Sequence, residues 1–484
     1  MDALPSTEQP ARSAPLSLRD VPGPRGIPLL GNSTQIRLDQ MHAQLEAWCR
    51  LYGNRYRIAL GRRQLLVCAD PEDVAAVLKD RPNGFRRSTR LEMVGRELQL
   101  AGVFGANGDD WRRQRAFVMH AFNPAHVKSY FPSLHTVAGR LMQRWNGLAD
   151  ASASFELEPD LMRYTVDVTA GLAFGTDINT IASEGTALQE HLANIFRMLQ
   201  KRLFSPFSYW HWWKRAEDRA LDNSVKVVGQ AVQEFIDLAR ARMESDASLY
   251  QHPNNLLEAM IAAQTHNASA VSDVELKGNV LTMLLAGEDT TAHTLAWLIY
   301  QLSRHPDVFS RMRAEIDAAL GTDALPERPE QLGTMSYTEA CISESMRMHP
   351  VAPLIGAEAL NDTTVGGVAV PKKTVVLLLT RVGAMQDANF TDAAAFRPER
   401  WLMPAADGNN KKTSIPFGAG PRLCPGRFLA IEEMKMMLSM LVRNFDIESV
   451  DTPDGAPPRE RLTLTMAPVG VRLKLRRRQE RRGE

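Results

Sequence analysis

"FGAGPRLCPG", residues 417–426, holds a single cysteine, Cys424, among three glycines and two prolines. Glycine and proline at this density indicate a tight loop rather than a helix or a strand. A thiol in such a loop can serve as a metal ligand or as a nucleophile, provided that its surroundings stabilise the thiolate. Each of these functions needs particular partner residues elsewhere in the chain, and those partners can be sought in the remaining sequence.

The overall composition is that of an ordinary globular protein. The chain has 484 residues, of which 44% are hydrophobic and 23% are charged, and its formal net charge is +1. This length can bury a large core, and a charge near zero gives no support to a nucleic-acid partner. The four cysteines are widely spaced and form no C-x-x-C pair, so neither a disulfide framework nor a zinc site is indicated.

One large domain is expected over residues 21–475, because no long linker, internal repeat or low-complexity segment interrupts them. Residues 1–20 are polar and are expected to be flexible, and residues 476–484 form a basic tail that is expected to be solvated. The N-terminal segment lacks the apolar core of a signal peptide or a membrane anchor. We therefore expect a cytoplasmic, monomeric protein with no transmembrane anchor.

The pattern of apolar residues predicts a mainly helical protein with a minor strand component. Alternation from Tyr56 to Leu60 indicates a strand that turns near Gly61 into a second strand. A helix is expected to follow, with Asp70 as its N-cap and Pro71 at its first position. A further strand region is expected around residues 366–382.

The longest helix is expected to run from Ser272 to about Arg304, a length of about 50 Å. Ser272 and Glu275 have the spacing of a capping box, and so do Ser336 and Glu339 at the start of a later helix. A helix of this length must cross the whole domain.

"AGEDTT", residues 286–291, interrupts the apolar turns of that long helix. Gly287 costs about 1 kcal/mol relative to alanine in a helix, and Asp289 and Thr290 are weak helix formers. A solvent-facing stripe is the simple explanation. The apolar runs on both sides favour a buried position instead.

Two other helices carry unusual polar pairs. Glu344 and Arg347 are three residues apart, and Trp111 and Arg115 are four apart, so each pair shares one helix face. A surface ion pair and an amphipathic helix with a basic outer face are the plain alternatives.

Several interpretations of the cysteine loop can be compared directly. A dinucleotide-binding G-x-G-x-x-G fails because Leu423 stands at its third glycine position. A cysteine protease would need a histidine base, and any of eleven histidines could supply it. An inert buried cysteine is the usual state of an isolated cysteine, and we expect it of Cys49, Cys68 and Cys341.

The loop resembles the F-x-x-G-x-R-x-C-x-G signature of the cytochrome P450 superfamily at every fixed position. The matching residues are Phe417, Gly420, Arg422, Cys424 and Gly426.

Four further motifs occur in the order and at the approximate spacing of that family. Glu344 and Arg347 resemble its E-x-x-R pair, and "FRPERW" resembles its P-E-R-F/W segment through Arg400. "AGEDTT" resembles its oxygen-binding helix motif, and Trp111 with Arg115 its W-x-x-x-R. The resemblance covers about residues 21–475 and implies the family's mainly α fold, with one large haem domain. The chain is somewhat similar to the haem domains of long-chain fatty acid hydroxylases.

The resemblance implies a non-covalently bound haem b whose iron takes the Cys424 thiolate as its axial ligand. Thiolate ligation of this kind favours cleavage of the O–O bond. The haem propionates would be neutralised by Trp111, Arg115 and Arg422. Many relatives have another arginine after the E-x-x-R motif, where this chain has Gly356 and Ala357, so the first three residues should carry more of that task.

Roles also follow for the central helix. Thr290 would donate a hydrogen bond to the bound oxygen and Asp289 would relay protons, while Ala286 and Gly287 would lie against the haem, with Gly287 leaving space for the oxygen. Glu344, Arg347 and Arg400 would form a structural lock behind the cysteine loop.

The substrate pocket is expected to be apolar. The resemblance suggests that it is lined by Phe104, Met283, Val351, Leu354, Ile355 and Leu464. An apolar lining favours a hydrophobic ligand without selecting one. The aromatic segment Phe204–Trp213 lies where the family has a mobile roof, and its role as gate, membrane contact or core is open.

The expected function is a haem-thiolate monooxygenase that inserts one oxygen atom of O2 into a hydrophobic substrate. No flavin or iron–sulfur module fits in the chain, so electrons should come from a separate ferredoxin or flavodoxin and an NAD(P)H-dependent reductase. Arg112, Arg113, Arg427 and Lys435 could form a basic docking patch, or could be ordinary solvated cations. The alternative function is a haem-thiolate protein that uses peroxide, or that rearranges or senses a ligand without activating O2.

Overall fold

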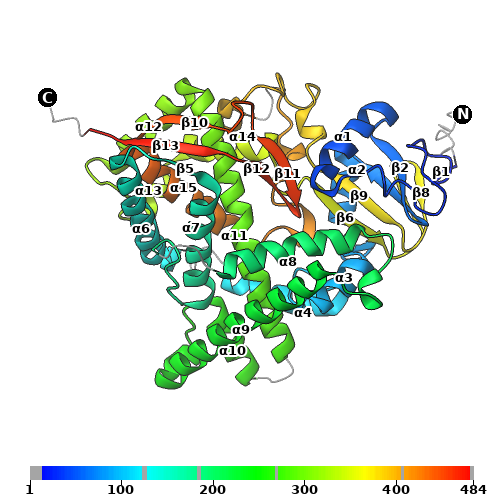
Figure 1. Cartoon of the computed structure of the whole chain (residues 1–484), viewed down its shortest axis with the longest axis horizontal. Coiled ribbons are helices and arrows are strands. Elements are labelled where there is room, and N and C mark those ends of the chain that lie inside the picture. The colour runs from blue at the N-terminus through cyan, green and yellow to red at the C-terminus, as the bar shows by residue number, and fades with distance from the viewer. Residues whose placement is uncertain (1–13, 123–127, 183–186, 267–270, 405–407, 480–484) are drawn as a thin grey trace, which may run out of the picture.

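The structure, a computed structural model, describes residues 14–122, 128–182, 187–266, 271–404 and 408–479. It is mainly helical with small sheets, as predicted (Figure 1). The helices are α1 Met41–Tyr52, α2 Pro71–Lys79, α3 Thr89–Glu97, α4 Gly108–Ala121, α6 Phe131–Asp150, α7 Leu157–Phe174, α8 Ala187–Phe204, α9 Ala216–Ser245, α10 Leu256–His266, α11 Asp273–Arg304, α12 Pro306–Leu320, α13 Pro329–Gly333, α14 Ser336–Met348 and α15 Arg427–Asn444.

The strands form four small sheets within the described ranges, with orders β2-β3-β9-β6-β4, β1-β8-β7, β10-β13-β5 and β11-β12. Their bounds are β1 Leu16–Ser17, β2 Arg55–Leu60, β3 Arg63–Cys68, β4 Phe85–Arg86, β5 Ser154–Glu156, β6 Leu354–Ala359, β7 Thr363–Val365, β8 Val368–Val370, β9 Val375–Leu379, β10 Phe445–Asp451, β11 Arg459–Thr463, β12 Thr465–Val469 and β13 Arg472–Arg477.

The predicted hairpin and the helix after it are confirmed. β2 and β3 pair antiparallel, and β2 alternates between half-buried and buried residues. Asp70 caps α2 by accepting hydrogen bonds from the N–H groups of Glu72 and Asp73, and Pro71 is the first helical residue.

The long helix α11 runs through the middle of the molecule (Figure 1). Its first half, from Leu276 to Leu285, belongs to one hydrophobic cluster, and its second half, from Ala292 to Leu302, belongs to another. Residues 286–291 therefore lie between two cores. This position explains why a polar segment can occur in an otherwise apolar helix.

The two predicted capping boxes have different outcomes. Ser272 and Glu275 exchange the two capping hydrogen bonds, which confirms the start of α11. The prediction for Ser336 and Glu339 is wrong, because Met335 is the N-cap of α14 and makes no side-chain cap. Glu315 of α12 instead accepts the N–H groups of Tyr337 and Thr338. A carboxylate from a packed neighbouring helix thus replaces the local cap.

The folded part extends beyond both expected boundaries. Leu16 and Ser17 form β1, which pairs with β8. The segment that we expected to be flexible, residues 1–20, therefore includes folded residues. At the other end β13 continues to Arg477, and Arg478 pairs with Asp317, so the start of the tail is folded too. Residues 1–13 and 480–484 lie outside the described residues. Among the residues described, no helix combines the length and apolarity needed to cross a membrane.

Candidate active site

The cysteine loop contains a short 3-10 turn, η7 (Gly420–Arg422), and leads directly into α15. The N–H of Cys424 donates to the carbonyl of Phe417 at 3.0 Å, which closes the loop. Gly420 has a φ of +69°, and a Cβ there would lie 2.5 Å from the carbonyl oxygen of Leu78 in α2. Only glycine satisfies both the backbone conformation and the close approach.

Cys424 differs from the other three cysteines. Cys49, Cys68 and Cys341 are buried thiols, whereas Cys424 is exposed to open space although it lies deep in the fold. Burial raises the pKa of the Cys424 thiol, and the N–H of Gly426 and the guanidinium of Arg115 act in the opposite direction. Binding of a metal ion would supply the remaining charge, because a coordinating thiol is deprotonated.

Two arginines converge beside this loop. The guanidinium of Arg422 lies 4.6 Å from the centre of the Trp111 ring and donates to the carbonyl of Ala106 at 2.7 Å. Arg115, one turn after Trp111 on α4, donates to the carbonyl of Leu423 at 2.5 Å. The predicted residues Trp111, Arg115 and Arg422 therefore share one site.

A third guanidinium, that of Arg87, was not predicted. Arg87 follows β4, which pairs antiparallel with β6 so that Phe85 lies opposite Ala359 and Arg86 opposite Glu358. The next position in this register sets Arg87 opposite Ala357, in the segment where many relatives have an arginine. The adjacent arginines in "FRRST" were the only sequence signal, and no motif distinguishes one from the other.

These cations have no opposing charge of their own. Burial lowers the pKa of Arg422 to about 9, assisted by the neighbouring charges of Arg87 and Arg81. Burial also lowers the pKa of Arg87 to about 10. The Nε atoms of Arg87 and Arg422 are buried without a hydrogen-bond partner, and no ion pair in the described ranges joins either residue to a carboxylate. The cluster therefore suits a ligand with carboxylate groups, and the residues present fit a haem above the thiol of Cys424.

On α11, the motif of residues 286–291 presents two different faces. Ala286 is exposed, Gly287 and Thr290 are half-buried, and Glu288 and Asp289 are buried. Ala286 and Thr290 are four residues apart, so both line the open face. Thr290 donates its hydroxyl hydrogen to the carbonyl of Ala286 at 2.9 Å, so in this arrangement its oxygen can accept hydrogen bonds from that open space but cannot donate one.

Gly287 has a packing role that the sequence did not indicate. A Cβ at this position would lie 2.1 Å from Oγ1 of Thr169. The missing side chain therefore allows α7 and α11 to approach closely, and the expectation that it leaves space for oxygen stays a prediction. Close helix packing cannot be read from the sequence because Thr169 is more than a hundred positions away.

Asp289 points away from the open face. Its carboxylate accepts a hydrogen bond from Thr465 of β12 at 3.2 Å. Burial raises the pKa of Asp289, while the nearby His293 lowers it. Glu288 is also buried, neither of its carboxyl oxygens has a hydrogen-bond partner in the described part of the chain, and burial raises its pKa well above the usual value. The simple alternative of a solvent-facing acidic stripe is therefore excluded.

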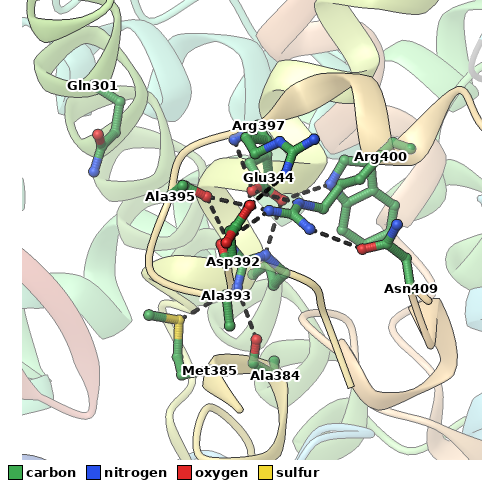
Figure 2. A network of polar contacts seen from close by, with 12 residues as sticks. Gln301, Glu344, Ala384, Met385, Asp392, Ala393, Ala395, Arg397, Arg400 and Asn409 are labelled. Carbon is green, nitrogen blue, oxygen red and sulfur yellow. Dashed lines mark hydrogen bonds and ion pairs between the residues drawn. The ribbon is translucent and has the colours of Figure 1, made fainter. Parts of the chain in front are cut away.

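Glu344 is the centre of a buried network (Figure 2). It accepts both Nε and Nη2 of Arg347, each at 2.8 Å, and Nε of Arg400 at 2.9 Å. Trp401 and the backbone N–H of Arg397 complete the set. The pair is not a surface bridge. Removing Arg347 would leave a buried carboxylate without its main partner, a loss of about 3–5 kcal/mol.

The six predicted pocket residues do not form one group. Met283 and Leu464 contact the same hydrophobic cluster, and the carbonyl of Val351 accepts the N–H of Met466 close to Leu464. Leu354 and Ile355 point to opposite faces of β6 and contact different clusters, so at most one of them can face the substrate.

Phe104, the sixth residue, lies under the guanidinium of Arg87, 4.4 Å from its ring centre. It therefore supports the cation cluster.

The aromatic segment is divided between core and surface. Trp210 is buried and donates to Glu97 at 2.8 Å, whereas Trp212 and Trp213 are 81% and 71% exposed. Phe204 and Phe207 line a cavity of about 320 Å³ together with Leu38. Of the roles that the sequence left open, packed core thus fits Trp210 alone among these three tryptophans.

The expected basic patch is smaller than proposed. Lys435 is buried and pairs with Glu339 at 2.6 Å, so it cannot contact a partner protein. Arg112 and Arg113 form ion pairs within their own helix, with Asp109 and Asp110.

Comparison with known proteins agrees with this fold and site. The cytochrome P450 family model matches residues 21–475, so the chain belongs to the cytochrome P450 family. The protein is thus an oxidoreductase of the haem-thiolate monooxygenase class, which uses haem, dioxygen, a redox partner and a hydrophobic substrate.

Particular relatives are similar along most of the chain. The cytochrome P450 monooxygenase himC of Aspergillus japonicus is 29% identical over 92% of this chain and 80% of its own. Cytochrome P450 3A12 of Canis lupus familiaris is 26% identical over 88% and 85%. Protein LUTEIN DEFICIENT 5, chloroplastic, of Arabidopsis thaliana is 25% identical over 84% and 69%.

Proposed function

We propose that this cytochrome P450 inserts one oxygen atom of O2 into a hydrophobic substrate, by hydroxylation or epoxidation. Two observations carry the proposal: the thiol of Cys424 on the cysteine loop is accessible, and the polar segment midway along α11 is open at Ala286 and Thr290. A protein that uses peroxide or rearranges its ligand would not require the acid and alcohol pair Asp289 and Thr290 in this segment.

The proposed cofactor is haem b, bound without a covalent link. Cys424 would be the axial ligand, and Trp111, Arg115, Arg422 and Arg87 would hold the two propionates. When bound, the haem supplies the activation of dioxygen, in which thiolate ligation favours O–O cleavage. The arginines would neutralise the propionates. The same contacts would offset the mutual repulsion and the desolvation cost of the buried guanidinium groups.

Asp289 and Thr290 are proposed as the catalytic pair. The Thr290 hydroxyl holds a hydrogen-bonding position on the open face of α11, and Asp289 supplies protons from the opposite face. Because the two side chains point in different directions, a proton must pass around the helix backbone, and a water molecule in the open space is the proposed carrier. A relay through a fixed carboxylate, one water molecule and a fixed hydroxyl delivers single protons while the site excludes bulk water.

We further propose that the electrons come from a separate ferredoxin or flavodoxin with an NAD(P)H-dependent reductase, and that the protein acts as a monomer in the cytoplasm. Three buried free thiols are compatible with a reducing compartment. The exposed Arg427, directly after the cysteine loop, remains available to an acidic partner.

The test is the ratio of oxygenated product to NAD(P)H oxidised. Thr290→Ala should bind haem and substrate normally but release mostly hydrogen peroxide, since the oxygen-facing hydroxyl is lost. Asp289→Asn should slow the whole cycle instead. Wild-type coupling and rate in Thr290→Ala would contradict the proposed role and would favour the function that does not activate O2.

A further inference from the structure

The acid of the central helix has a buried histidine one turn away. Asp289 and His293 are four residues apart on α11, so their side chains lie on the same face. His293 is 2% exposed, and its Nδ1 has no hydrogen-bond partner within the described residues. A buried imidazole with one unused nitrogen beside a buried carboxylate is costly unless it has a function.

The other nitrogen of His293 leads to the surface. Nε2 lies 3.1 Å from Oε1 of Glu158, in the first turn of α7. The Glu158 side chain is 25% exposed, and the same oxygen accepts a hydrogen bond from Arg461 of β11 at 3.3 Å. Titratable groups thus occur from solvent at Glu158, through a hydrogen bond to His293, to the neighbouring carboxylate of Asp289, whose charge acts on His293.

The charged groups around His293 come from three elements. Glu158 belongs to α7, Arg461 to β11 and Asp289 to α11 itself, and Asp289 is in turn adjacent to Glu288. Burial lowers the pKa of His293, but the hydrogen bond to Glu158 and the charge of Asp289 outweigh it, so the pKa lies above 6.5. This imidazole can therefore gain and lose a proton near neutral pH.

We propose that His293 and Glu158 form the proton path that recharges Asp289 from solvent during turnover. This inference rests on the proposed oxygen-activating function, which assigns proton delivery to Asp289. It adds the residues that supply the proton.

The proposed step moves one proton and involves no oxidation or reduction. Glu158 takes a proton from solvent and passes it from Oε1 to Nε2 of His293, which becomes an imidazolium. His293 then releases its Nδ1 proton to a water molecule, which passes a proton to the Asp289 carboxylate, and Glu158 is left ionised. The neutral ring is left with its proton on Nε2, and exchange of this proton with water restores the Nδ1–H tautomer before the next transfer.

The first experiment compares His293→Gln with a matched control, His42→Gln. His42 is also buried, its Nε2 lies 2.8 Å from Glu460, and its Nδ1 also lacks a partner, but it belongs to α1. Both glutamines keep a hydrogen-bond donor for the glutamate and cannot relay a proton. Melting temperature and the reduced carbon monoxide spectrum show that each variant is folded and carries its haem.

His293→Gln should lower the rate of product formation by about tenfold or more and raise its solvent isotope effect. It should also remove the fall in rate that wild type shows as pH rises through the pKa of His293. His42→Gln should remain within about twofold of wild type. A His293→Gln enzyme with wild-type rate, pH profile and isotope effect would overturn the path.

The second experiment does not depend on turnover. In the reduced carbon monoxide complex, which is diamagnetic, the ring nitrogens of His293 are titrated by NMR and assigned by their loss in His293→Gln. The pKa of His293 should fall in Asp289→Asn and in Glu158→Gln. An unchanged pKa in both would overturn the path. If wild type forms no product from O2, the proposed function fails while this titration still decides whether the three residues are coupled.

Discussion

At the scale of single residues, the haem site contains charges that are unfavourable until a ligand arrives. Arg87 and Arg422 lie close enough for their charges to interact, and their buried Nε atoms have no hydrogen-bond partner among the residues that the structure describes. Buried cations without counter-charge cost several kcal/mol. Their presence makes sense if two propionates neutralise them, so the stability of the site belongs to the complex.

Arg87→Leu should have opposite effects on the protein without haem and on the protein with haem. Without haem the variant should be more stable than wild type by about 1 kcal/mol or more, because one unpaired buried charge is removed. With haem it should lose the cofactor at least about tenfold faster, because a charge-assisted hydrogen bond is missing. Transfer of haem to excess apomyoglobin measures the loss, and urea unfolding measures the stability.

Ala357→Arg in the Arg87→Leu background should restore haem retention, because the register places the two positions opposite each other. Arg86→Leu is the control, since Arg86 pairs with Glu92 and should not affect haem loss. Equal haem loss in Arg87→Leu and Arg86→Leu would show that Arg87 is not a propionate partner.

At the scale of elements, an ion pair ties α4 to the start of α11. Arg113 donates to both carboxylate oxygens of Glu275, which also caps α11 through Ser272. Burial would raise the pKa of Glu275, but Arg113 and Ser272 outweigh it and lower the pKa to about 2. Because α4 carries Trp111 and Arg115, this pair also positions the haem site.

The pH dependence of unfolding should reveal this pair. The folded pKa of Glu275, about 2, lies below its ordinary value of 4.5. Its contribution is therefore complete above pH 4.5 and is lost as the pH falls toward 2. Glu275→Gln should be less stable at pH 7 and show a smaller loss of stability over that window. The free energy of unfolding against pH provides the measurement, with Glu244→Gln, on the exposed surface of α9, as control. Parallel curves for wild type and Glu275→Gln would contradict the assignment.

At the scale of the whole molecule, α11 joins two hydrophobic clusters that meet around residues 286–291. Elsewhere in the molecule, the cysteine loop contacts α4 and the segment before it through Arg115 and Arg422. A bound haem would stabilise these segments together, because a ligand that binds only the folded state adds its binding energy to stability.

Extraction of the haem should therefore loosen one region selectively. Hydrogen exchange should accelerate in residues 101–107 and 417–426, while the cluster formed by α6, α7 and α12 keeps its protection. Mass spectrometry of the holoprotein and the apoprotein, at one pH and temperature, measures this difference. Uniform acceleration over the chain would show instead that the apoprotein unfolds as a unit.

Much of the architecture could be predicted from short-range patterns. The Ser272 cap, the alternation in β2 and the Asp70 cap each depend on residues within a few positions of one another. The cysteine loop is similarly local, since its glycines and prolines fix its shape. The suggestion that Lys435 belongs to an exposed basic patch was wrong, because the sequence of a helix does not show which of its cations pairs with a carboxylate of a neighbouring element.

What the sequence determined by itself is therefore local: the helical class, the long central helix and the tight loop around Cys424. Only the tertiary structure decided which distant groups meet. It placed Arg86 opposite Glu358, Thr465 on Asp289 and Glu158 on His293. The physical reason is that backbone propensity and capping act within a turn, whereas burial of charge depends on neighbours that packing supplies from more than a hundred residues away.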